Sequence, residues 1–157
     1  MTDAPLSLDQ ALRLAITHHQ EGRLADAEHV YRAILETEPG HADANHNLGV
    51  LAVQLGKPEL SLSYLKAALE ANPAQGQYWL SLIETLITLG RSADARAILA
   101  AGLQRGLSGP VVEGFQARLQ DRDRDPNGPK AVQPTPAAAA GPPISRRQRR
   151  TQARKRP

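Results

Sequence analysis

The chain has 157 residues, of which 22% are charged, and it contains no cysteine. This length allows one compact domain with a tail, and the lack of cysteine excludes a disulfide framework and a thiolate metal site. No apolar run is long enough to span a bilayer, and the first nine residues lack the cationic-then-apolar order of a signal peptide. We therefore expect a cytoplasmic protein, a location that the absence of cysteine also suits.

The two parts of the chain carry opposite charge. Residues 1–120 contain nine Lys and Arg against thirteen Asp and Glu, a net charge of −4. Residues 121–157 contain ten Lys and Arg against three Asp, a net charge of +7. The basic character therefore belongs to the C-terminal segment, and the preceding part is mildly acidic.

Glycines and prolines recur along the chain with one period. Gly22, Gly56 and Gly90 are 34 residues apart, and Pro39 and Pro73 keep the same interval. A period of this length is typical of a solenoid in which pairs of helices are stacked side by side. It predicts an all-α protein, an α-solenoid of three helix pairs.

The signals for helix ends fit this period. Ser7 and Gln10 have the spacing of a capping box, which predicts a helix that begins beside Ser7 and ends before Gly22. A second helix is expected over about residues 24–37, because Pro39 prevents its continuation. The same plan predicts four more helices, the last of them capped by Ser92, at about 42–55, 58–72, 76–89 and 92–105.

Apolar and small side chains recur in the same register, which predicts how the pairs pack. One pair cannot bury its apolar face alone, but stacked neighbours can. A shorter capping helix over about 111–120, with Val111, Phe115 and Leu119 on one stripe, should cover the outer face of the last pair. The recurring positions are Leu14, Leu48 and Leu82; Leu35, Leu69 and Leu103; Ala27, Ser61 and Ala95; and Tyr31, Leu65 and Leu99.

The composition changes at residue 121, where Pro, Gly and Ala become frequent and apolar periodicity stops. Such a segment buries too little surface to offset the entropy of ordering, so we expect a disordered linker and basic tail. The predicted organisation is a flexible N-terminus at 1–7, a folded domain at 8–120 with repeats at about 8–41, 42–75 and 76–109 and the capping helix at 111–120, and the disordered segment at 121–157.

Further residues keep their places in the three units: Leu14, Ala15, Gly22, Ala27, Tyr31 and Pro39 in the first, Leu48, Gly49, Gly56, Ala68 and Pro73 in the second, and Trp79, Leu82, Gly90 and Ala95 in the third. With these marks, residues 8–107 resemble the tetratricopeptide repeat. The third unit departs from the family at Ile83, Gly102 and Leu107, so its end is expected to be less regular. Trp79 is expected to lie in the core.

The resemblance implies a concave groove, lined by the first helix of each pair, that binds another protein or a peptide segment. Relatives that hold a peptide carboxylate use cations there, but Leu12, Val50 and Leu80 occupy those places. We therefore expect an apolar ligand segment such as an amphipathic helix. The alternatives are a self-association surface or a neighbouring domain. The expected lining is Leu12, Ile16, His19, His46, Asn47, Val50, Val53, Leu80, Glu84 and Ile87.

Asn47 matches one position of the asparagine ladder with which relatives similar to O-linked N-acetylglucosamine transferase hold a peptide backbone. Arg13 and Ser81 take the neighbouring places, so a single rung remains, and the other interpretation is an ordinary surface residue. The segments 47–49 and 72–79 resemble the repeats that precede bacterial glycosyltransferase or sulfotransferase domains.

The C-terminal basic segment is a candidate for binding nucleic acid, an anionic lipid surface or an acidic protein face. It lacks interleaved aromatic residues, so any nucleic-acid binding would be nonspecific. The alternative is a solvated tail, or one that folds back on the acidic domain. Retention on heparin after deletion of residues 144–157 separates these possibilities. The cations are Arg146, Arg147, Arg149, Arg150, Arg154, Lys155 and Arg156.

The sequence contains no phosphate-binding loop, no nucleophile-elbow motif and no metalloprotease motif. We expect no catalytic residue, no metal and no cofactor. The first hypothesis is a non-enzymatic scaffold that binds a partner segment. The second is a detached or truncated substrate-recruiting region of a glycosyltransferase-like enzyme, and the third is a polyanion-binding protein. Five histidines lack the spacing of a shared metal site: His18, His19, His29, His41 and His46.

Overall fold

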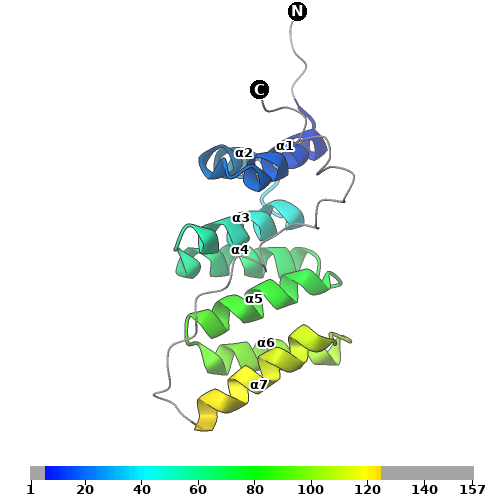
Figure 1. Cartoon of the computed structure of the whole chain (residues 1–157). Coiled ribbons are helices and arrows are strands. Elements are labelled where there is room, and N and C mark those ends of the chain that lie inside the picture. Colours follow the sequence, from blue (N-terminus) through cyan, green and yellow to red (C-terminus); the bar gives the residue numbers. More distant parts are fainter. Residues whose placement is uncertain (1–5, 125–157) are drawn as a thin grey trace, which may run out of the picture.

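The computed structural model describes residues 6–124. Within this range the chain forms helices and no strands, so the predicted all-α solenoid is confirmed. The helices lie one above another in a single column, with α1 and α2 at one end and α7 at the other (Figure 1). They are α1 (Leu8–Gln20), α2 (Leu24–Thr37), α3 (Ala42–Gln54), α4 (Pro58–Ala71), α5 (Gly76–Thr88), α6 (Ser92–Gln104) and α7 (Pro110–Arg124).

The period of the sequence is preserved in the helix starts. The first helices of the units, α1, α3, α5 and α7, begin 34 residues apart, and so do the second helices, α2, α4 and α6. Each second helix packs against its own first helix and against the first helix of the next unit. The helix α7 therefore takes the place of a first helix in a fourth, incomplete unit.

A glycine makes the turn inside each pair, as the sequence predicts. Gly22, Gly56 and Gly90 have φ angles of 77°, 72° and 75°, a left-handed conformation that other residues rarely adopt. At each turn the following N–H bonds back to the first helix; that of Lys57 donates to the carbonyl oxygen of Ala52 at 2.8 Å. This reversal folds the second helix back along the first.

The helix starts match the prediction in one case and differ in another. Ser7 and Gln10 form the predicted capping box at the start of α1. The prediction that Ser92 caps α6 is wrong, because Arg91 is the N-cap and Ser92 is the first helical residue. The preceding glycine turn sets this register, and the Arg91 side chain donates to the carboxylate of Asp94 at 2.7 Å.

Buried side chains form two clusters along the column. One lies among α1, α2 and α3 and includes Tyr31 and Ile34, and the other lies among α4 to α7 and includes Trp79. The prediction that Trp79 belongs to the core is therefore confirmed. Where α3 meets α4, a β-carbon at Gly49 would lie 2.8 Å from the side chain of Leu65. The missing side chain thus allows these two helices to approach closely.

Two leucines of the repeated apolar pattern are not part of the core. Leu14 is 37% exposed and Leu103 is 40% exposed. Leu48, which shares the register of Leu14, is buried against α2, but no described helix precedes α1. Leu103 lies on α6, which contacts α7 less closely than α2 contacts α3 or α4 contacts α5. At both ends of the column, a leucine of the repeated pattern therefore stays exposed, because the neighbouring helix that would bury it is not described or packs less closely.

The helix α7 differs from the prediction in its buried stripe. Val112, Phe115 and Leu119 are buried, whereas Val111 is 54% exposed. The buried positions are spaced i, i+3 and i+7, and the predicted ones were spaced i, i+4 and i+8. Both spacings fit a helical period, but the contacts with α5 and α6 select the first.

The helix α7 is also longer than the predicted range of 111–120, and it continues four residues into the segment predicted to be disordered. Arg96 of α6 holds this last part. Its guanidinium group donates to the carbonyl oxygen of Leu119 at 2.7 Å and to the carboxylate of Asp123 at 2.5 Å. Asp121 and Arg124 also pair at 3.8 Å. These contacts extend the helix beyond its apolar stripe.

Candidate partner-binding face

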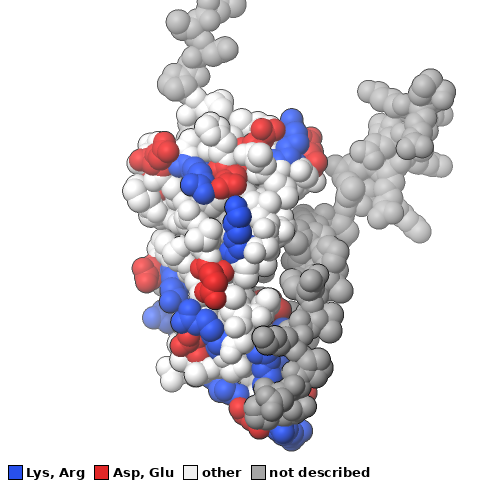
Figure 2. Space-filling model, turned by 90° about the vertical axis from the view of Figure 1, so that its left-hand side faces the viewer, with Lys and Arg blue, Asp and Glu red and all other residues white. Residues whose placement is uncertain are grey.

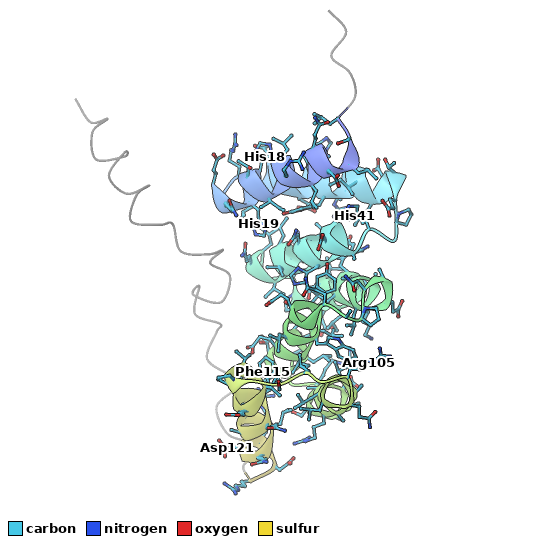
Figure 3. All side chains as sticks on the ribbon, turned by 90° about the vertical axis from the view of Figure 1, so that its right-hand side faces the viewer. His18, His19, His41, Arg105, Phe115 and Asp121 are labelled. Atoms are coloured by element: carbon cyan, nitrogen blue, oxygen red, sulfur yellow. The ribbon has the colours of Figure 1, made fainter. Side chains whose placement is uncertain are left out.

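The first helices α1, α3, α5 and α7 each contact the next one in order. We call their solvent-facing sides the inner face. The predicted groove residues lie on α1, α3 and α5. Near the end of α1, His18 and His19 point to different sides of the helix (Figure 3). Only His19 has a hydrogen bond to the next first helix, through Nε2 to Gln54 at 2.8 Å.

Polar side chains link each first helix to the next one. Every link joins residues 34 or 35 positions apart, so the sequence period is repeated in the side-chain contacts. Such links fix the spacing between neighbouring helices and therefore the shape of the inner face. They are His19 Nε2 with Gln54 Oε1 (2.8 Å), His46 Nε2 with Ser81 Oγ (2.9 Å), the Tyr78 hydroxyl with the Asp43 carboxylate, and Arg118 with Glu84 (2.6 Å).

Apolar side chains on the inner face lie between these links. Each of them is half-buried, so part of its surface contacts the core and part reaches solvent. A helix face with this composition can contact an apolar partner without any rearrangement of the core. The apolar strip, as we name it, consists of Leu12, Ile16, Val50, Val53 and Leu80.

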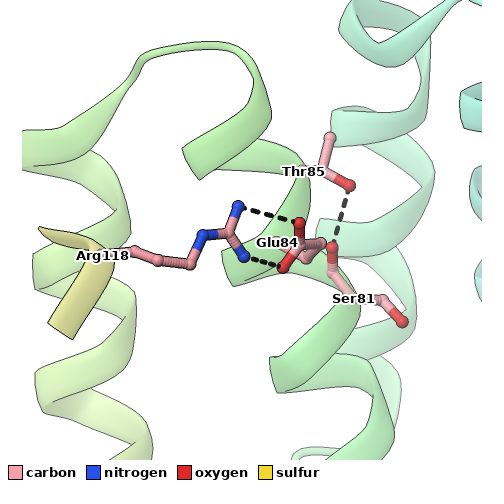
Figure 4. Close-up of polar contacts among 4 residues, drawn as sticks. All are labelled: Ser81, Glu84, Thr85 and Arg118. Atoms are coloured by element: carbon pink, nitrogen blue, oxygen red, sulfur yellow. Dashed lines mark hydrogen bonds and ion pairs between the residues drawn. The ribbon is translucent and has the colours of Figure 1, made fainter. Parts of the chain in front are cut away.

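Two residues of the expected lining differ from the others, one by burial and one by an ion pair. Ile87 is 0% exposed and belongs to the core of α5, which corrects its assignment to the lining. Glu84 accepts two hydrogen bonds from Arg118 of α7, at 2.6 and 3.1 Å (Figure 4). This bidentate pair occupies the carboxylate, so the third unit offers less free surface than the first two.

Sequence reasoning missed Arg118 as a residue of the inner face. Arg118 lies within the predicted capping helix but outside its predicted stripe, and because α7 occupies the position of a first helix, Arg118 comes against Glu84. The spacing of 34 residues between the two was the signal that could have found it.

His46 lies in the middle of the inner face, half-buried on α3. Its ring stacks on that of Tyr78, with centroids 4.8 Å apart. Burial lowers the pKa of His46 below its usual value, although neighbouring Asn47 and Asp43 act in the opposite direction. Its Nε2 is bonded to Ser81 Oγ at 2.9 Å, so the ring joins α3 to α5 by both stacking and a hydrogen bond.

Two clefts lie away from the inner face. The larger, of about 270 Å³, lies where the α4–α5 turn meets the end of α6, and Trp79 and Leu107 line it. The Trp79 indole N–H donates to the carbonyl oxygen of Pro73 at 2.9 Å, and the Arg105 guanidinium lies 5.8 Å from its ring. The smaller cleft lies among α2, α3 and α4. Neither is lined by a predicted groove residue.

Within residues 6–124, no three His, Asp or Glu side chains gather to form a metal site. In the same range, no helix has the length and apolar character needed to cross a membrane. The cations of the predicted polyanion-binding segment, from Arg146 to Arg156, lie outside the described residues.

Comparison with solved structures identifies three instructive likenesses. The Yersinia enterocolitica translocator chaperone SycD is 18% identical, with a TM-score of 0.66 over 76% of this chain and 90% of that one. The first repeat domain of Spaghetti (RPAP3), bound to an HSP90 peptide, is 12% identical, with a TM-score of 0.68 over 76% and 98%. A mutant of the Thermobaculum terrenum O-GlcNAc transferase is 23% identical, with a TM-score of 0.57.

The match to the transferase covers 62% of this chain but 19% of the enzyme. At these identities the likenesses show a shared fold. No curated protein sequence matches the chain significantly. The family model described as "Tetratricopeptide repeat" matches residues 12–62 and 46–110, which together make up more than half of the sequence. The chain therefore belongs to the tetratricopeptide-repeat family.

Proposed function

We propose that the chain is a cytoplasmic, non-enzymatic adaptor whose inner face binds an apolar segment of a partner protein. The apolar strip carries this proposal. Its residues are half-buried and come from three successive first helices, so they form a track along the column rather than an isolated patch. Asn47, half-buried on α3, is left beside the strip, where its side-chain amide can bond the backbone of a bound segment.

An apolar segment suits this face better than an acidic one. Leu12, Val50 and Leu80 stand where carboxylate-binding relatives carry cations. The cation that α7 brings to the face, Arg118, is already paired with Glu84. The fold is used for peptide binding elsewhere: SycD has been solved with a peptide of the translocator YopD, at 19% identity to this chain. This use supports a peptide ligand but does not specify its sequence.

The proposal predicts that the full chain binds a fluorescein-labelled amphipathic helical peptide with leucines on one face. Leu12→Asp should weaken this binding at least about tenfold, because it replaces apolar contact worth about 1.5–3 kcal/mol with a charge. Fluorescence anisotropy measures the affinity, and circular dichroism checks that the variant remains folded.

Leu103→Asp is the matched control, since it changes an exposed leucine on α6, away from the inner face. This variant should bind the peptide as the unchanged chain does. A second peptide, the acidic HSP90 type that Spaghetti binds, should bind weakly. Tight binding of the acidic peptide and none of the leucine-rich one would contradict the proposal.

A second candidate is the substrate-recruiting region of a glycosyltransferase-like enzyme. The likeness to the O-GlcNAc transferase favours it. Asn47 supports it further, because it is half-buried on α3 and keeps the 34-residue register of the ladder, with Arg13 of α1 and Ser81 of α5 at the corresponding positions. Copurification of a transferase with the tagged full chain would support this candidate. If no transferase copurified with the chain in repeated experiments, this candidate would be removed.

A further inference from the structure

Two large apolar side chains are exposed beside the turn between α3 and α4. Leu60 is 58% exposed and Leu55 is 39% exposed. In the first and third units, the register of Leu60 is taken by Asp26 and Asp94, and in the first unit that of Leu55 is taken by Glu21. At the register of Leu60 the second unit therefore has leucine where both neighbours have aspartate, whereas at the register of Leu55 the third unit also has leucine, Leu89.

This exchange has a cost for α4 if the surface stays in water. An acidic residue in the first turn of a helix is stabilised by the helix dipole, and α4 already has Glu59 there. Leu60 adds no second carboxylate and exposes apolar surface instead. A second contact, outside the chain, would remove that apolar surface from water.

The two leucines continue an apolar surface that reaches into the core. They line the small cleft of about 40 Å³ among α2, α3 and α4, whose floor includes the buried Leu51. Tyr64 of α4, also lining the cleft, is half-buried against the cluster of the first unit. We name Leu55, Leu60 and Tyr64 the turn patch.

Charges of both signs surround the turn patch. Glu28 and Arg32 pair with each other at 2.7 Å along one side of the cleft. Lys57 lies on the other side, and exposed Glu59 is adjacent to Leu60 in the chain. Figure 2 views the side of the column that carries this turn and shows blue and red side chains interspersed around uncharged surface. The patch therefore suits neither a strongly acidic nor a strongly basic partner.

We propose that the turn patch is a self-association surface, on which a second copy of this chain docks by two-fold symmetry. A two-fold contact places a patch against itself, so an apolar centre with charges of both signs is complementary to its own copy. Leu60 would pack against the same residue of the second copy, while Lys57 faces Glu59. Because the patch is small, the dimer forms at high protein concentration. The inner face stays free in this arrangement.

Sedimentation equilibrium of the full chain tests the proposal. The weight-average mass should rise with concentration from 16.9 kDa towards that of two copies. Leu60→Asp introduces the residue that the other units carry, so it should fold normally and stay monomeric at every concentration. Leu103→Asp, on α6, should associate as the unchanged chain does. A chain that is monomeric throughout, or a Leu60→Asp variant that still associates, would overturn the proposal.

Cross-linking gives an independent test, because the chain has no cysteine. Under mild oxidation, Leu60→Cys should form a disulfide-linked dimer faster than Leu103→Cys does. Leu12→Asp changes the inner face and not the turn patch, so it should leave self-association unchanged. Loss of self-association in Leu12→Asp would place the contact on the inner face and overturn the assignment to the turn patch.

Discussion

Two buried tyrosine hydroxyls differ in how they are satisfied. The hydroxyl of Tyr31 is buried and has no hydrogen-bond partner among the described residues. The hydroxyl of Tyr78 donates to the carboxylate of Asp43 on the neighbouring first helix. A buried polar group without a partner costs about 1–3 kcal/mol, whereas a bond to a charged acceptor stabilises the fold. The same side chain thus has opposite consequences in the first and third units.

We predict that Tyr31→Phe raises the free energy of unfolding by about 1 kcal/mol, because it removes an unpaired hydroxyl and keeps the ring. Tyr78→Phe is the matched control and should lower that free energy by about 1–2 kcal/mol, because it removes a bond to a carboxylate. Urea unfolding followed by circular dichroism measures both. A large loss of stability in Tyr31→Phe would show that its hydroxyl is bonded in solution.

The buried hydroxyl of Tyr31 also makes the stability of the fold depend on pH in the alkaline range. Burial raises the pKa of Tyr31 to about 12, from 10 in the unfolded chain. A group with a raised pKa contributes its full stability below the unfolded value and loses it as the pH rises towards the folded value. Unfolding free energy should therefore fall between about pH 10 and 12, and less steeply in Tyr31→Phe.

At the scale of single elements, the end of α6 shows how a departure from the family pattern is accommodated. The helix ends one residue earlier, relative to the period, than α2 and α4 do. Leu107 takes the place of the closing proline, and its N–H donates to the carbonyl oxygen of Gly102 at 2.9 Å. A β-carbon at Gly102 would lie 2.9 Å from Leu107 and 3.2 Å from Trp79. The glycine therefore makes room for the leucine.

We predict that Gly102→Ala destabilises the chain by about 1 kcal/mol, although alanine is the better helix former. In a Leu107→Ala background the same change should instead stabilise by about 0.5 kcal/mol, since the shortest contact is gone, the approach to Trp79 at 3.2 Å remains, and the helix propensity of alanine is retained. A double-mutant cycle from urea unfolding measures this coupling. Equal effects of Gly102→Ala in both backgrounds would show that the two residues do not interact.

The elements that could be predicted from the sequence are those specified by local signals. Gly22 and its counterparts need a left-handed turn, and the capping box at Ser7 is complete within four residues. The extent of α7 could not be predicted, because it depends on a bond from Arg96 to Asp123, 27 residues further along. The pairing of Arg118 with Glu84 is also a contact between helices, and its 34-residue spacing becomes a signal only once α7 is recognised as a first helix. For the candidate site, the sequence pattern predicted which helices form the inner face. It did not predict which of their side chains are buried or paired with a neighbouring helix.

At the scale of the whole molecule, the core is divided along the column. One cluster joins α1 to α3 and the other joins α4 to α7, and α3 and α4 meet between them at Gly49 and through Tyr64. In a repeat protein each unit contacts only its neighbours, so stability is close to a sum of unit and interface terms. A loss in one cluster is therefore felt mainly within that half of the column.

We predict that Phe115→Ala, which removes a buried ring from α7, costs about 3–5 kcal/mol and speeds amide hydrogen exchange in α5 to α7. Ile34→Ala, in the other cluster, should speed exchange in α1 to α3 and leave α7 protected. Exchange measured by mass spectrometry on peptides from every helix resolves the two patterns. If both variants accelerated exchange equally in all seven helices, the column would unfold as one cooperative unit, and the divided core would have no energetic meaning. The predicted asymmetry would also keep the inner face of the first two units, where most of the apolar strip lies, intact when α7 is released.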